Sequence, residues 1–149
     1  MKNKMENKMM IKFSSVPTNE AFARTAVAAF VAPLDPTIEE LTEIKTGVSE
    51  AVSNAIIHGY KEDPKGIVSL ECCTYEDGKV MISIEDEGVG IEDIEKAREP
   101  MFTTGKTEER SGMGFTVMES FMDKVGIQSE PGKGTKITLM KQLDMSYGM

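Results

Sequence analysis

Polar residues recur at helical spacing in the middle of the chain. Glu50, Asn54 and His58 follow one another at intervals of four, so they share one face of a predicted helix. A carboxylate, an amide and an imidazole in line suit a hydrophilic ligand, although a solvated helix face would carry the same pattern. Glu43 and Gly47 extend the stripe. A mid-helix glycine costs roughly 1 kcal/mol relative to alanine, and we expect Gly47 to clear space beside Glu50.

A second candidate segment combines a carboxylate with glycines. Asp86 ends a predicted strand and is followed by Gly88 and Gly90, which leave the next turn without side chains. A flat ligand could approach that backbone while the aspartate accepts a hydrogen bond from an exocyclic amine. An ordinary turn at the end of a strand would have the same composition, so the segment alone leaves both interpretations open.

Two further segments are rich in backbone donors. Residues 110–115, Arg-Ser-Gly-Met-Gly-Phe, open a predicted helix, where N–H groups, the helix N-terminus and the Arg110 guanidinium can hold an anion. Gly134 and Thr135 follow a tight turn and begin a strand. Taken alone, these segments are also typical of a glycine-rich loop and of a simple hairpin turn.

Hydropathy patterning predicts the elements that position these residues. We expect strands over 9–13, 67–76, 79–85, 125–130 and 135–141, with the first at a sheet edge. We expect helices over about 18–34, 35–60, 94–98 and 113–124. Asp35 and Pro36 are the predicted start of the long helix. Because no strand–helix–strand repeat occurs, we expect an α+β fold, a two-layer sandwich of a mostly antiparallel β-sheet with helices on one face.

Length and composition limit the function classes. The 149 residues predict a single domain over 1–149. A formal net charge of −8 argues against free nucleic acid as the main partner. No apolar run approaches the roughly 20 residues of a membrane span, and the charged N-terminus has no apolar stretch typical of a signal peptide. The only cysteines, Cys72 and Cys73, are adjacent and point to opposite faces of a strand, which favours a cytoplasmic location.

The four candidate segments occur in a fixed order along the chain. They are Glu50-x-x-x-Asn54, Asp86-x-Gly88-x-Gly90, Gly112-x-Gly114 and Gly134-Thr135. This ordered set resembles the ATP-binding (Bergerat) fold of the GHKL superfamily of gyrase, Hsp90, histidine kinases and MutL. Residues 43–60, 102–104 and 109–115 are similar to the bacterial anti-sigma factor serine kinases. Residues 19–24 and 56–60 are similar to the sporulation branch of that family, whereas 105–107 departs from the Lys-Pro-type sequence expected there.

The resemblance implies a role for each segment. The residues implied to bind the adenine are Asp86, Thr135, Gly88 and Gly90. Those implied to hold the phosphates are Ser111, Gly112, Gly114 and, at the γ-phosphate, Arg110, with Thr104 as a further ATP-binding residue. Asn54 would bind Mg²⁺ through its amide oxygen. Glu50 would be the catalytic base for the attacking hydroxyl, and residues from about 91 to 111 would form a lid over ATP.

The resemblance also implies protein partners. The chain would hold a sporulation sigma factor away from RNA polymerase and would phosphorylate a serine of the anti-sigma factor antagonist. Arg24 is a candidate partner contact, although a solvated surface arginine would look the same, and the strand over 9–13 could form the edge of a homodimer. Alternatives are a stress-response anti-sigma kinase, a non-catalytic nucleotide-dependent sigma-binding module, and the catalytic half of a histidine kinase or gyrase-like ATPase.

Overall fold

A computed structural model of the chain describes residues 3–99 and 109–148, and of residues 109–113 and 147–148 only the backbone. The strands form one sheet in the order β1-β2-β3-β5-β4, and each neighbouring pair is antiparallel. Their bounds are β1 Met5–Ser14, β2 Ile67–Tyr75, β3 Lys79–Asp86, β4 Lys124–Glu130 and β5 Gly134–Gln142. β1 lies at the sheet edge as predicted, but it begins four residues before the predicted strand.

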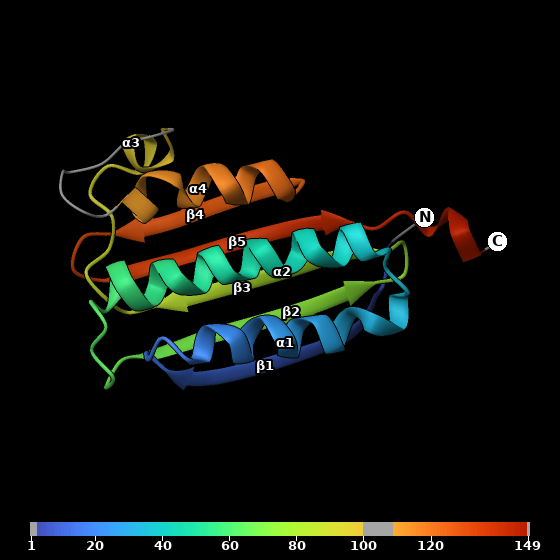
Figure 1. Cartoon of the computed structure of the whole chain (residues 1–149), viewed down its shortest axis with the longest axis horizontal. Coiled ribbons are helices and arrows are strands. Elements are labelled where there is room, and N and C mark those ends of the chain that lie inside the picture. Colours follow the sequence, from blue (N-terminus) through green and yellow to red (C-terminus); the bar gives the residue numbers. More distant parts are fainter. Residues whose placement is uncertain (1–2, 100–108, 149) are drawn as a thin grey trace.

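Helices cover one face of this sheet. Figure 1 shows α1 (Asn19–Val31), α2 (Ile38–Ser53) and α4 (Glu109–Phe121) side by side over the strands, with α3 (Ile94–Arg98) beside one end of α4. Buried apolar side chains such as Val27, Val48 and Leu139 fill the space between the two layers. The predicted α+β sandwich, with its antiparallel sheet and one helical layer, is therefore confirmed. Among the residues that the structure describes, no helix has the length and apolar composition needed to cross a membrane.

The long helix begins later than predicted. Its N-cap is Thr37, whose hydroxyl accepts the Glu40 N–H at 3.0 Å while the Glu40 carboxylate accepts the Thr37 N–H at 2.9 Å. This reciprocal pair satisfies two N–H groups that the first helical turn leaves open. Asp35 instead ends the preceding 3₁₀ turn in a left-handed conformation, with φ of 56°. The predicted start at Asp35 and Pro36 is therefore wrong by two residues.

The long helix also changes character before it ends. The α-helical part stops at Ser53, and residues Asn54–Gly59 form a π-helix, which we label η2. Its wider hydrogen-bond pattern is visible in the Tyr60 N–H, which donates to the Ala55 carbonyl at 2.9 Å. Such π turns are rare, and many of them lie at functional sites.

Gly47 serves helix packing rather than an open space beside Glu50. The residue is buried, and a Cβ atom added to it would lie 2.9 Å from the Sδ atom of Met122. Met122 follows α4, so the missing side chain lets the end of α4 approach α2. The expectation that Gly47 clears room at Glu50 is therefore wrong.

Candidate functional site

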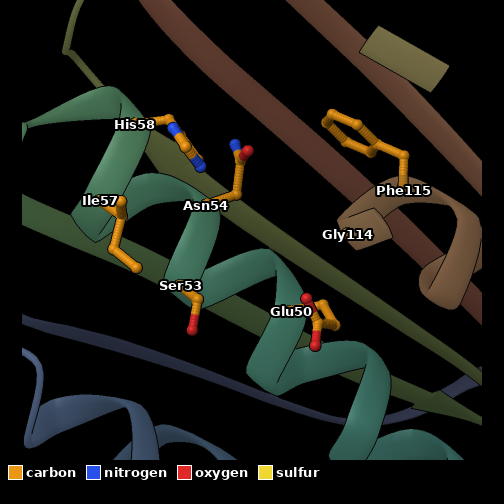
Figure 2. A pocket seen from close by; sticks show the side chains of 7 residues that line it. All are labelled: Glu50, Ser53, Asn54, Ile57, His58, Gly114 and Phe115. Carbon is orange, nitrogen blue, oxygen red and sulfur yellow. The ribbon is translucent and has the colours of Figure 1, made fainter. Parts of the chain in front are cut away.

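A small pocket opens where η2 faces α4. Figure 2 shows Asn54 and His58 pointing from η2 toward the side on which Gly114 and Phe115 lie. The residues that line it are Glu50, Ser53, Asn54, Ile57, His58, Gly114 and Phe115. A Cβ atom added to Gly114 would lie 3.5 Å from Oε1 of Glu50, so the α4 backbone comes close to that carboxylate. The structure thus brings Glu50, Asn54 and Gly114, which were predicted from separate segments, around one pocket.

Asp86 is the last residue of β3, and its carboxylate is almost fully enclosed. Only 4% of the residue is exposed. Oδ1 accepts the Gly88 N–H at 2.9 Å. Burial raises the pKa of the Asp86 carboxyl, and the Gly88 and Thr135 N–H groups oppose that rise only in part. A buried, under-compensated carboxylate at the end of a strand is suited to accept a further hydrogen bond from a ligand.

Glycines around Asp86 are required by close backbone contacts. A Cβ atom at Gly59 would lie 2.7 Å from the Asp86 carboxyl carbon, and one at Gly88 would lie 1.9 Å from the Gly59 carbonyl oxygen. A Cβ atom at Gly90 would lie 2.1 Å from the Glu130 carbonyl oxygen. The positions that side chains at Gly88 and Gly90 would occupy are therefore filled by protein backbone. Gly59 lies within the helix predicted over 35–60, and its contact with the aspartate was not predicted from the sequence.

Hydroxyl groups continue this site across the next two strands. Thr135 of β5 lies opposite Asp86 in the strand register, and Ser129 of β4 lies opposite Thr135. The two hydroxyl oxygens are 2.8 Å apart, and Ser129 Oγ also accepts the Ile91 N–H at 2.7 Å. Ser129 thereby fixes the chain where it leaves the Asp86 turn. The predicted strands over 125–130 and 135–141 would pair Glu130 with Thr135. The observed register is shifted by one residue, so Ser129 was not predicted as a site residue.

The two groups of residues adjoin at one end of the sheet. His58 lines the pocket at Glu50, and the next residue, Gly59, contacts Asp86. Asp86 and Thr135 line an open depression at the end of the strands. The Glu50 carboxylate on α2 and the Asn54 amide on η2 thus stand beside a second, buried carboxylate. These oxygen atoms can accept hydrogen bonds from a polar ligand and can bind a hard cation.

Other predicted site residues lie on α1, in the first turn of α4 or outside the described residues. Arg24 lies on α1 and forms an ion pair with Glu20 at 2.7 Å. Arg110, Ser111 and Gly112 belong to the first turn of α4, which begins at Glu109 and so starts four residues before the predicted helix. The side chains of that turn are not described, and Thr104 lies outside the described residues.

Comparisons with known proteins identify the family of this chain. Residues 13–141 match the histidine kinase-like ATPase domain family. The anti-sigma F factor of a Geobacillus species is 61% identical over 145 residues, which cover 97% of this chain and 99% of the relative. That of Geobacillus stearothermophilus is 62% identical over 92% of this chain and 93% of its own length. That of Clostridium perfringens is 56% identical over 94% and 99%, respectively.

Solved structures share the fold. The RsbU and RsbW domains of a Mycobacterium tuberculosis protein match with a TM-score of 0.66 and 20% identity, over 93% of this chain and 33% of that one. A histidine kinase domain from Erythrobacter litoralis matches with a TM-score of 0.53 and 16% identity, over 83% and 61%, respectively. With the family match over most of its length and relatives near 60% identity, this chain belongs to the anti-sigma F factors, within the histidine kinase-like (GHKL) ATPase family.

Proposed function

We propose that this chain is an anti-sigma factor that binds a sporulation sigma factor and uses Mg-ATP to phosphorylate a serine of the antagonist. The observation that carries the proposal is the placement of Glu50 and Asn54 in one pocket that adjoins the buried Asp86. The family supports it, because the relatives that match over nearly their full length are named anti-sigma F factors. The ATPase domain implies that the ligand is ATP.

Asp86 is the group proposed to recognise the adenine base. Its enclosed carboxylate already accepts the Gly88 N–H and can accept a further hydrogen bond from the exocyclic amino group. Thr135 lies opposite it and offers a hydroxyl to the same ligand edge. Gly88 and Gly90 contribute by holding the turn in place through the close backbone contacts described above.

Asn54 fits the proposed role of a magnesium ligand. Its amide oxygen is a hard donor that points from η2 into the pocket, and Mg²⁺ commonly takes one or two protein oxygens beside water and phosphate oxygens. When bound, the ion would neutralise phosphate charge. Family resemblance assigns further ATP contacts. The phosphates would be held by the first turn of α4, with Arg110, Ser111 and Gly112. Thr104 would bind ATP from the lid over about 91–111.

Glu50 is the proposed catalytic base. Its carboxylate stands at the pocket and would accept the proton of the serine hydroxyl as that oxygen bonds to the γ-phosphorus. The bond from the γ-phosphorus to the bridging oxygen breaks, and ADP leaves with that bond's electron pair. Positioning of this kind contributes most of the rate in phosphoryl transfer, since the protein makes no covalent bond itself.

The proposed partners extend the assignment beyond the pocket. Arg24 on α1 is the proposed contact for the sigma factor or antagonist, with Glu20 orienting its guanidinium. The edge strand β1 is the proposed homodimer edge. We further propose that residues 1–149 act as one domain in the cytoplasm, with regulation arriving through these proteins.

The deciding experiment is phosphate transfer from radiolabelled ATP to the antagonist of the source organism. The variant Glu50→Gln should lose at least a hundredfold in transfer rate while it still binds ATP. Glu39→Gln, at the exposed start of the same helix, is the matched control and should keep full transfer. Full transfer by Glu50→Gln would refute its role, and a wild-type chain that labels nothing would indicate a non-catalytic module. Identification of the sigma factor that co-purifies with the chain separates the sporulation from the stress-response assignment.

A further inference from the structure

Tyr60 uses one hydroxyl to join three segments of the chain. The hydroxyl donates to the Ile67 carbonyl at 2.7 Å and accepts the Glu87 N–H at 2.7 Å. Tyr60 itself directly follows η2, Ile67 begins β2, and Glu87 follows the last residue of β3. The phenol therefore links the end of the π-helix to the start of one strand and the end of the next.

The position of the Tyr60 ring is set by a glycine. A Cβ atom added to Gly66 would lie 2.5 Å from Cγ of Tyr60, so only a residue without a side chain admits the ring there. Gly66 is itself tied down, because its carbonyl accepts the Ser15 N–H at 2.8 Å. Desolvation raises the pKa of the Tyr60 phenol, which keeps the hydroxyl protonated and able to donate at neutral pH.

The turn after β3 is held by its own backbone donors. The Glu87 N–H is donated to Tyr60, the Gly88 N–H to the Asp86 carboxylate, and the Val89 N–H to the Gly59 carbonyl at 3.0 Å. Two of these three consecutive donors therefore end on the adjacent residues 59 and 60. The orientation of Asp86 depends on this turn, since Gly88 is the donor that fixes its Oδ1.

We propose that Tyr60 is a positioning residue that sets the direction of the Asp86 carboxylate and thereby the discrimination of adenine from other purines. The proposal rests on the proposed function, in which Asp86 accepts a hydrogen bond from the adenine amino group. Tyr60 does not need to touch the nucleotide. It acts through Glu87 and Gly88, and removal of its hydroxyl leaves the ring against Gly66 in place.

The variant Tyr60→Phe tests this role by removing one oxygen atom. The assay is calorimetric titration with ATP and with inosine triphosphate, whose base carries an oxygen in place of the amino group. We expect ATP affinity to fall about three- to tenfold, as for loss of one hydrogen bond, and the preference for ATP over inosine triphosphate to fall by a similar factor. Tyr75→Phe, which removes the same atom from the far end of β2, is the control and should change neither value.

Each outcome bears on the proposal. An unchanged nucleotide preference in a folded Tyr60→Phe chain would overturn it, and so would an equal loss of affinity for both nucleotides, which would indicate a purely structural role. Amide exchange at Glu87 in the wild-type chain gives a second measurement that needs no variant: fast, unprotected exchange also overturns the proposal. A wild-type chain that does not prefer ATP would instead refute the adenine role of Asp86, and the inference with it.

Discussion

The ion pair between Lys141 and Glu43 should respond unequally to loss of its two members. The Lys141 ammonium lies 2.5 Å from Oε1 of Glu43 and 2.7 Å from the Phe121 carbonyl oxygen. Only 10% of the Lys141 side chain is exposed, against 26% for Glu43. Lys141 thus joins β5 to α2 and to the C-terminal end of α4. A positive charge there also interacts favourably with the partial negative charge of the helix dipole.

The loss in the free energy of unfolding depends on which of the two charges stays in the protein without its partner. Glu43→Ala leaves the enclosed ammonium with the Phe121 carbonyl, and loss of one partner from a buried pair costs roughly 3–5 kcal/mol. We take about 3 kcal/mol, at the low end of that range, because one acceptor remains. Lys141→Met keeps the apolar stem and leaves a carboxylate that water reaches, so the loss is near that of one charged hydrogen bond, about 1.5 kcal/mol.

Urea and thermal denaturation followed by circular dichroism measure both values. In a chain of 149 residues, each 1 kcal/mol corresponds to a shift in Tm of about 2–4 °C. Glu43→Ala should therefore lower the Tm by about 6–12 °C and Lys141→Met by about 3–6 °C. The double variant should lose less than the sum, because it leaves no enclosed charge without its partner. A larger loss for Lys141→Met, or strict additivity, would refute this reasoning.

Other predictions concern the buried groups near the site and in the sheet. Burial raises the folded-state pKa of Asp86. At pH values just above the ordinary aspartate pKa of about 3.9, the folded chain therefore binds more protons than the unfolded chain. The free energy of unfolding should fall as pH rises through that window, and Asp86→Asn should flatten this part of a urea-denaturation profile. Gly59→Ala, with its Cβ 2.7 Å from the Asp86 carboxyl carbon, should lower ATP affinity by roughly tenfold in calorimetric titration; unchanged affinity would contradict the close contact. Burial raises the pKa of the Cys72 thiol to about 12, so maleimide pulse labelling should modify Cys72 only after unfolding.

Elements with local signals were predicted well from sequence. The hairpin of β2 and β3 was expected within one residue at each end, because Asp77-Gly78 marks its turn and Gly78 has a φ of +90°. The start of α2 was misplaced although its signal is present, since Thr37 and Glu40 form the spacing of a capping box. Pro36 favoured the wrong boundary because proline is over-represented at the first position of helices.

Features that depend on distant segments could not be read in this way. The π-helix at Asn54–Gly59 has no periodic signature of its own. The need for glycine at position 59 arises only because Asp86, 27 residues later, approaches it from β3. Ser129 lies opposite Thr135 only because the turn of the last hairpin is one residue shorter than predicted, which shifts the register of the two strands by one residue. Candidate site residues were therefore found by type and order, while the contacts that orient them required the fold.

The same contacts imply that nucleotide and fold stabilise one another. Asp86 is enclosed while its pKa is raised, so in the absence of a ligand its carboxylate lowers the stability of the sheet end. A donor supplied by adenine would favour the ionised form and offset that burial. Because Gly59 and Gly88 pack on this group and Tyr60 holds the adjacent N–H, the gain would spread to η2 and the start of β2. Saturation at a hundredfold excess over Kd adds about 2.7 kcal/mol to any chain that binds only when folded. In this chain, the slowing of amide exchange on nucleotide binding should therefore be largest around residues 59–60 and 86–89.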